Sequence, residues 1–113
     1  MTPEEFVDGL MISVVEENAI SYRDLLEKNI KSSDRYWNDS NALFWTLSAD
    51  QRQVLLNMLR QTAIDTVSNV LGIIDGSSYL DGAGELIELR VGGRDLGGDL
   101  QGMFLARVEQ GNE

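Results

Sequence analysis

The stretch that decides the fold is residues 48–74, SADQRQVLLNMLRQTAIDTVSNVLGII. Its apolar and semi-apolar residues recur as adjacent pairs every four positions, which is the spacing of a helix. The pairs are Val54/Leu55, Met58/Leu59, Thr62/Ala63, Thr66/Val67 and Val70/Leu71. Ser48 followed by Gln51 is typical of a capping box, and Gly76 suits a left-handed C-cap. The pattern therefore predicts one long helix from Ser48 to about Ile74.

The apolar stripe of this helix is unusually wide. Leu56, Ile64 and Leu71 extend it past half of the helix circumference and leave only a narrow polar side. A helix that is apolar around so much of its girth is normally covered on several sides. We therefore expect residues 48–74 to lie at the centre of the core, wrapped by the rest of the chain.

Residues 1–47 predict two further helices. Thr2-Pro3-Glu4-Glu5 combines an N-cap, a proline in the first turn and a capping-box glutamate, so a first helix is expected over residues 1–30. The polar run at residues 16–18 interrupts its apolar face and indicates a bend or a register shift. A second helix is expected from Ser33 to about Leu47, and it carries both tryptophans.

The chain changes character after Gly76. Glycines replace helix formers, and Glu85–Val91 alternates apolar and polar residues as a half-buried strand does. Gly92-Gly93 suits a two-residue hairpin turn, Arg94–Leu96 a short return strand, and Asp99 the N-cap of a last helix. The expected fold is α+β and mainly α: a three-helix core, a small antiparallel hairpin and a short C-terminal helix, in one domain over residues 1–113.

Composition bounds the chemistry. The 113 residues include no Cys and no His, which removes thiol chemistry and the commonest general base and metal ligand. There are 19 acidic and 9 basic residues, a net charge of −10. Nucleic acids and anionic membranes attract basic proteins, so neither is an expected partner. The sequence shows no apolar run of membrane-span length and no secretory leader pattern, and we expect a cytoplasmic protein.

The acidic balance favours a basic protein as partner, because complementary charge speeds and orients association. Two groups of acids predict the contact surface. They are Glu4, Glu5, Asp8, Glu16 and Glu17 near the N-terminus, and Asp75, Asp81 and Glu85 in a segment without bases. The alternative is that these acids only keep the protein soluble.

A polar patch interrupts the long helix. Thr62, Asp65, Thr66 and Asn69 are neighbours at helical spacing. If the helix is covered as expected, these groups are partly buried and need hydrogen-bond partners, which predicts a network that fixes a neighbouring helix or the hairpin. The alternative is a small pocket in which Asp65 acts as an acid–base group. No catalytic residue, metal ligand or cofactor is assigned, since the glycines match no nucleotide motif and the acidic loop after residue 74 does not fit a calcium loop.

Residues 47–76 (LSADQRQVLLNMLRQTAIDTVSNVLGIIDG) and 97–105 (GGDLQGMFL) resemble small acidic bacterial proteins, among them immunity proteins of toxin–immunity systems. This resemblance implies a non-enzymatic protein that masks a basic site on its partner. Two alternatives remain at this point: an oligomeric structural protein whose self-interface is formed by Trp37, Phe44 and Trp45, and a carboxylate-based enzyme.

Overall fold

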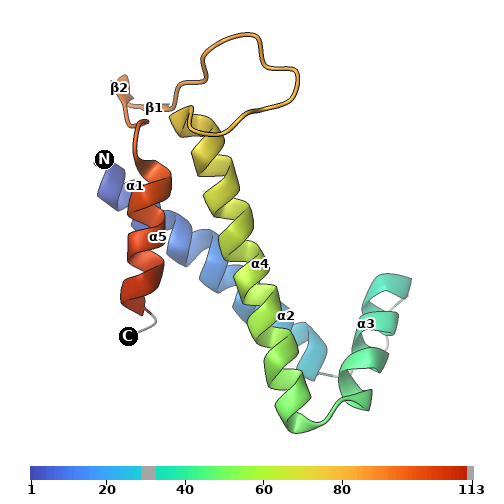
Figure 1. The fold of residues 1–113 in the computed structure, drawn as a ribbon. Helices are drawn as coiled ribbons and strands as arrows, with labels where there is room; N and C mark the ends of the chain where they lie inside the picture. Colours follow the sequence, from blue (N-terminus) through green and yellow to red (C-terminus); the bar gives the residue numbers. More distant parts are fainter. Residues whose placement is uncertain (29–32, 112–113) are drawn as a thin grey trace.

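The computed structural model describes residues 1–28 and 33–111 and is mainly helical, with one small antiparallel sheet, so the expected fold class is confirmed (Figure 1). The elements in chain order are α1 (Pro3–Leu10), the π-helix η1 (Met11–Glu16), α2 (Glu17–Glu27), α3 (Arg35–Thr46), α4 (Ala49–Asp75), β1 (Arg90–Val91), β2 (Arg94–Asp95) and α5 (Leu100–Gly111).

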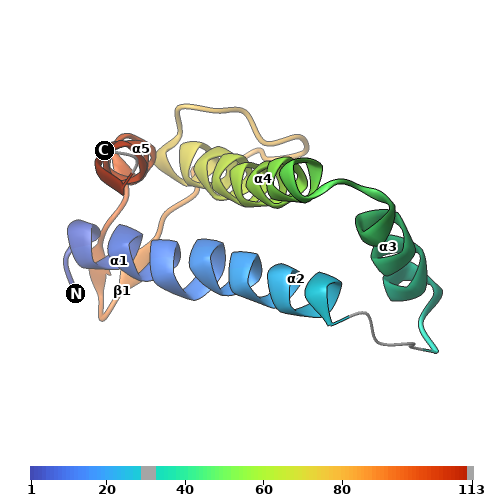
Figure 2. The same cartoon turned by 90° about the horizontal axis from the view of Figure 1, so that it is seen from below.

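The segments α1, η1 and α2 follow one another without a break and form one rod that lies beside α4 (Figures 1 and 2). The rod begins at the expected capping box: Thr2 Oγ1 accepts from Glu5 N, and Thr2 N donates to Glu5 Oε1. The π-helix at Met11–Glu16 is the expected register shift, because wider turns rotate the residues that follow. The expected last turn at residues 29–30 lies outside the described residues.

Both predicted caps of α4 are present. Ser48 Oγ accepts from Gln51 N at 3.1 Å, and Ser48 N donates to Gln51 Oε1 at 2.9 Å. Gly76 ends the helix with φ +81°, in the left-handed region that favours glycine. These local signals therefore fix both ends of the element to which the rest of the chain attaches.

The apolar side chains gather in two separate clusters along α4. The larger cluster joins α1, η1, the C-terminal half of α4 and α5, and consists of Val7, Met11, Val15, Ile64, Leu71, Leu100, Phe104 and Val108. The smaller cluster joins α2, α3 and the N-terminal half of α4, and its buried residues are Leu26, Phe44 and Leu56. In Figure 2, α5 is seen end-on at one end of the paired rods, and α3 lies at the other end.

The rest of the chain covers α4 less completely than expected. Val54, Met58 and Val70 are each at least half exposed. The physical reason is a shortage of covering elements: α5 reaches only the C-terminal half of α4, and α3 diverges from α4 on leaving the short connection at residues 47–48 (Figure 1). Parts of the long helix consequently face solvent.

The hairpin is shorter than predicted. Arg90 is opposite Asp95 and Val91 is opposite Arg94, and Gly92 and Gly93 take the positive φ angles that the tight turn needs. Only Arg90–Val91 of the expected strand at Glu85–Val91 is paired, because the return segment ends after a few residues. The Arg90 guanidinium forms an ion pair with Glu88 at 3.1 Å.

The molecule is open for its size. The Cα radius of gyration is 17.3 Å, whereas a compact domain of this length has about 13 Å. Its accessible surface is 7789 Å², whereas a monomer of this size typically exposes about 6,200 Å². The chain therefore leaves uncovered a surface that a compact fold would bury.

Candidate functional site

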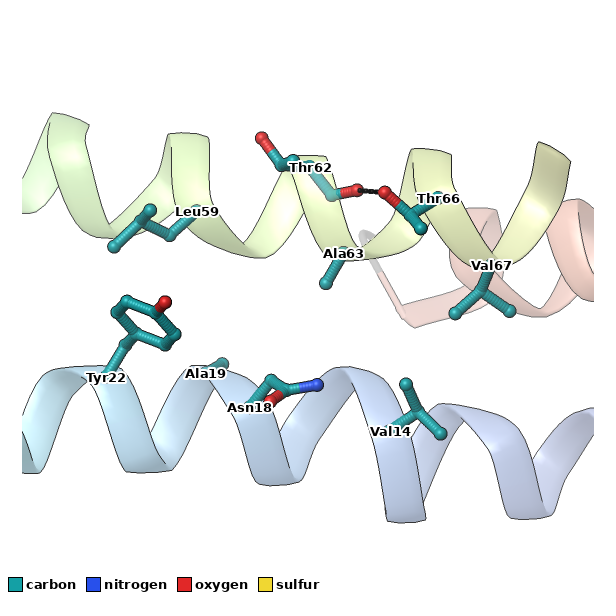
Figure 3. A pocket seen from close by; sticks show the side chains of 9 residues that line it. All are labelled: Val14, Asn18, Ala19, Tyr22, Leu59, Thr62, Ala63, Thr66 and Val67. Atoms are coloured by element: carbon teal, nitrogen blue, oxygen red, sulfur yellow. Dashed lines mark hydrogen bonds between the residues drawn. The ribbon is translucent and has the colours of Figure 1, made fainter. Parts of the chain in front are cut away.

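An apolar groove lies between the rod and α4, in the gap between the two clusters (Figure 3). Its volume is about 250 Å³. Nine residues without formal charge line it: Val14, Asn18, Ala19 and Tyr22 from η1 and α2, and Leu59, Thr62, Ala63, Thr66 and Val67 from α4.

The groove exists because small side chains occupy its middle. Figure 3 shows Leu59 above Tyr22 at one end and Val67 above Val14 at the other. Between these pairs the two helices present alanines, Ala19 and Ala63, which leave a hollow that larger side chains would fill.

The sequence pointed to the polar patch that borders this groove but misjudged its environment. Thr62, Asp65, Thr66 and Asn69 are all exposed, so the prediction of a buried network is wrong. Thr62 Oγ1 donates to Met58 O and Thr66 Oγ1 to Thr62 O, both at 2.8 Å and both within α4. The patch fixes no neighbouring helix, because no element covers this side of α4.

Tyr22, at one end of the groove, also contacts two aromatic side chains of α3. Its hydroxyl shares a 2.8 Å hydrogen bond with that of Tyr36, and its ring lies 5.3 Å from the ring of Trp37. The hydrogen bond with Tyr36 raises the pKa of Tyr22 above its ordinary value, and partial burial adds to the effect. This contact ties α3 to α2.

The three aromatic residues of the alternative self-interface, Trp37, Phe44 and Trp45, cannot all contact a second molecule. Phe44 is 1% exposed and is a core residue of the smaller cluster. Trp45 donates from Nε1 to Leu26 O at 3.0 Å, and the Arg52 guanidinium lies over its ring. These aromatic residues hold α3 against α2 and α4, and Phe44 is out of reach of a second molecule.

Asp75 has a role inside the fold that the sequence did not suggest. Its Oδ1 accepts from Gly98 N and Leu100 N, and its Oδ2 accepts from Gln101 N, at 2.8–3.0 Å. The last residue of α4 thus caps the start of α5, where free amides and the helix dipole favour a carboxylate.

Three of the other predicted surface acids also have partners within the chain. Asp8 pairs with Arg107 of α5 at 3.1 Å, Glu16 pairs with Arg60 of α4 at 2.7 Å, and Glu5 completes the capping box of α1. Both ion pairs tie the rod to another helix. Each of these acids remains at least partly accessible, but its charge is partly balanced.

Glu4, Glu17, Asp81 and Glu85 are exposed. They do not form one surface with each other, because residues 77–86 and α1 lie on opposite sides of α4 (Figure 2). Glu17 and Asp65 each precede a lining residue in the sequence, but neither lines the groove. The groove itself is therefore uncharged.

Sequence reasoning missed the apolar lining of the groove as a site. Its only local signal was a pair of alanines on two predicted helices, Ala19 and Ala63, and nothing in the sequence shows that both line one groove. Within residues 1–28 and 33–111 no cluster of acids is arranged to hold a metal ion, and no helix there is both long and apolar enough to cross a bilayer.

Comparison with known proteins finds that the chain matches no protein-family model, no curated protein and no solved structure.

Proposed function

We propose that this chain is a non-enzymatic binding protein that engages a basic partner protein, and that the partner inserts an amphipathic segment into the groove between the rod and α4. The observation that carries the proposal is the groove itself: an open apolar hollow of about 250 Å³ between two helices. Helix-in-groove recognition uses such a hollow, into which an amphipathic helix lays its apolar face.

The size of the exposed surface supports this function. The chain exposes about 1,600 Å² more than a monomer of its size, whereas a standard protein–protein interface buries about 800 Å² on each partner. Val70, one turn beyond Thr66 and Val67 on α4, is half exposed and continues the groove side of the helix. A partner covering this side would bury apolar surface that the chain itself leaves open.

The charge supports a basic partner. With a net charge of −10, the chain attracts cationic proteins and repels acidic ones. A protein that masks the basic site of a toxin or a nucleic-acid enzyme, as the resemblance to immunity proteins implies, is one form of this function. Its association should weaken as salt screens the charges.

The first experiment uses a synthetic 18-residue helix with leucines on one face and lysines on the other, titrated while tryptophan fluorescence is followed at 50 and 500 mM NaCl. We expect saturable binding that weakens at high salt. A matched peptide with glutamates in place of lysines should not bind, because the chain carries a net charge of −10.

Two matched variants locate the binding. Ala63→Leu fills the middle of the groove, and Ala42→Leu makes the same change on an exposed part of α3. We expect Ala63→Leu to weaken the peptide about tenfold or more and Ala42→Leu to leave it unchanged, since only the first removes the apolar hollow. The proposal is overturned if neither peptide binds and a pull-down from the source cell recovers only the chain itself at both salt concentrations.

A further inference from the structure

The outer edge of β1 carries free backbone groups. Leu96 N donates to Leu89 O at 2.9 Å, and Val91 is opposite Arg94, so Leu89 and Val91 turn their backbone groups toward β2. In an antiparallel ladder the alternate residues turn the other way, which here are Glu88 and Arg90. Within the described residues, the backbone of Glu88 has no hydrogen-bond partner.

Apolar side chains lie next to this edge without cover. Leu86 is 91% exposed, more than any other large apolar side chain in the described residues, and Ile87 is partly exposed. The alternation of a strand thus extends back to Ile87, beyond the point at which the chain supplies a partner. An open edge with exposed apolar residues is a template for pairing with another strand.

We propose that a second copy of this chain pairs with the outer edge of β1, antiparallel and about a twofold axis at Leu89. In this register Glu88 of each copy is opposite Arg90 of the other copy, and Ile87 is opposite Val91. The two-stranded hairpins of the two copies then form one four-stranded sheet. Such an interface is isologous and closes on itself.

Two features determine the register: which residues direct their backbone N–H and C=O groups toward the open edge, and the charges of their side chains. Both copies can hydrogen-bond only through Glu88 and Arg90, so the register must pair even-numbered residues with even-numbered residues. A shift by two residues either way places Glu88 opposite Glu88 or Arg90 opposite Arg90, and directly opposed like charges destabilise a sheet. The proposed register pairs opposite charges twice.

The side chains of Glu88 and Arg90 are placed so that their ion pair within one chain can be replaced by ion pairs between the two copies. Within one chain Arg90 Nη2 lies 3.1 Å from Glu88 Oε2, and both side chains are more than half exposed. They therefore share one face of the strand and can pair across the axis without rearrangement of the hairpin. The proposal does not depend on a basic partner, because it uses the sheet edge and not the groove.

The experiment measures the monomer–dimer equilibrium of the full chain by sedimentation at 50 and 500 mM NaCl. We expect a reversible dimer that tightens at high salt, since two chains of −10 repel each other. Glu88→Arg and Arg90→Glu, each alone, should raise the dimer dissociation constant about 10- to 30-fold, because each opposes like charges at two positions. The double variant should restore the dimer.

Arg94→Glu is the matched control, because it makes the same charge change on β2 without touching the outer edge of β1. Circular dichroism of every variant checks that the monomer still folds. A chain that stays monomeric at all concentrations overturns the proposal, and so does a dimer that ignores the single charge reversals. The salt response distinguishes failure of the dimer proposal from failure of the basic-partner proposal. Salt should strengthen the association of two copies of the chain, and it should weaken the binding of a basic partner.

Discussion

The two halves of α4 differ in how well the chain covers them. The C-terminal half packs against α1, η1 and α5 in the larger cluster, and its Leu71 is 1% exposed. The N-terminal half packs against α2 and α3 through only three buried side chains, and its Val54 and Met58 are more than half exposed. One helix thus belongs to a well-formed core at one end and to a sparse one at the other.

Because of this difference, the surface at one end of α4 is used within the fold, whereas the surface further along the helix stays open to a partner. At the C-terminal end the polar groups are used within the fold: Asp75 caps α5, and Gln101 Nε2 donates to Ser68 O at 3.0 Å. Between the two ends lies the apolar groove, which is lined by η1, α2 and α4. We infer that the packed end defines the fold and that the open stretch is where a partner would bind.

The largest effect is expected from matched truncations in the two clusters. Phe104→Ala, in the larger cluster, should lower the free energy of unfolding by about 4–5 kcal/mol, and Phe44→Ala, in the smaller one, by about 3 kcal/mol. The sparse cluster can collapse or admit water more easily, so its cavity costs less. Chemical denaturation measures both. Equal losses would contradict the contrast between the two halves.

The second largest effect is expected at the cap of α5. Asp75→Ala removes the acceptor of three backbone amides and should lower the free energy of unfolding by about 2–3 kcal/mol. Asp81→Ala, in the exposed loop, is the control and should change it by less than about 0.5 kcal/mol. If both variants behave alike in thermal unfolding, Asp75 is a surface acid after all.

A smaller effect is expected where α4 and α5 approach closely. A Cβ at Gly72 would lie 2.8 Å from Ser78 Oγ and 2.9 Å from Gln101 Nε2, so Gly72→Ala displaces the contact between Gln101 and Ser68. We expect a net loss of about 1 kcal/mol despite the better helix propensity of alanine.

Gly9→Ala should change the free energy of unfolding in the opposite direction when it is measured in the same experiment. A Cβ at Gly9 meets nothing within 4 Å, so only the gain in helix propensity remains. Its free energy of unfolding should rise by about 0.5–1 kcal/mol. A loss at Gly9 or a gain at Gly72 would show that packing at the α4–α5 crossing is looser than described.

The smallest effect is expected in the sparse half, from Tyr36→Phe. It removes one exposed hydrogen bond to Tyr22 and should cost less than about 1 kcal/mol. The raised pKa of Tyr22 should return toward its ordinary value of 10.0, which a spectrophotometric titration of tyrosinate detects.

The sign of the pH dependence follows from the direction of the shift. A pKa raised in the folded state favours the protonated phenol, so the contribution of Tyr22 is present below about pH 10 and is lost as the pH rises through the folded value. Tyr79→Phe is the control, because this 80% exposed side chain lies outside the contact. A Tyr36→Phe titration that matches the wild type would show that the two hydroxyls are not coupled.

Local chemistry explains most of what the sequence predicted correctly. The capping boxes at Thr2 and Ser48, the left-handed Gly76 and the Gly92-Gly93 turn each depend on a few adjacent residues, and all are present. The predicted strand at Glu85–Val91 was largely wrong as a paired strand, because pairing requires a partner of equal length elsewhere in the chain. Alternation alone indicates a suitable strand, not an available partner.

The sequence by itself determined where the helices begin and end, where the chain turns, and that the molecule is acidic and mainly helical. These properties follow from side chains acting on their own or neighbouring backbone. Only the tertiary structure decided that Asp75 caps α5 and that Ala19 and Ala63 line the same groove. It also decided that α4 has an open side. Those facts depend on which helices meet, and that is set by how much apolar surface each distant segment can cover.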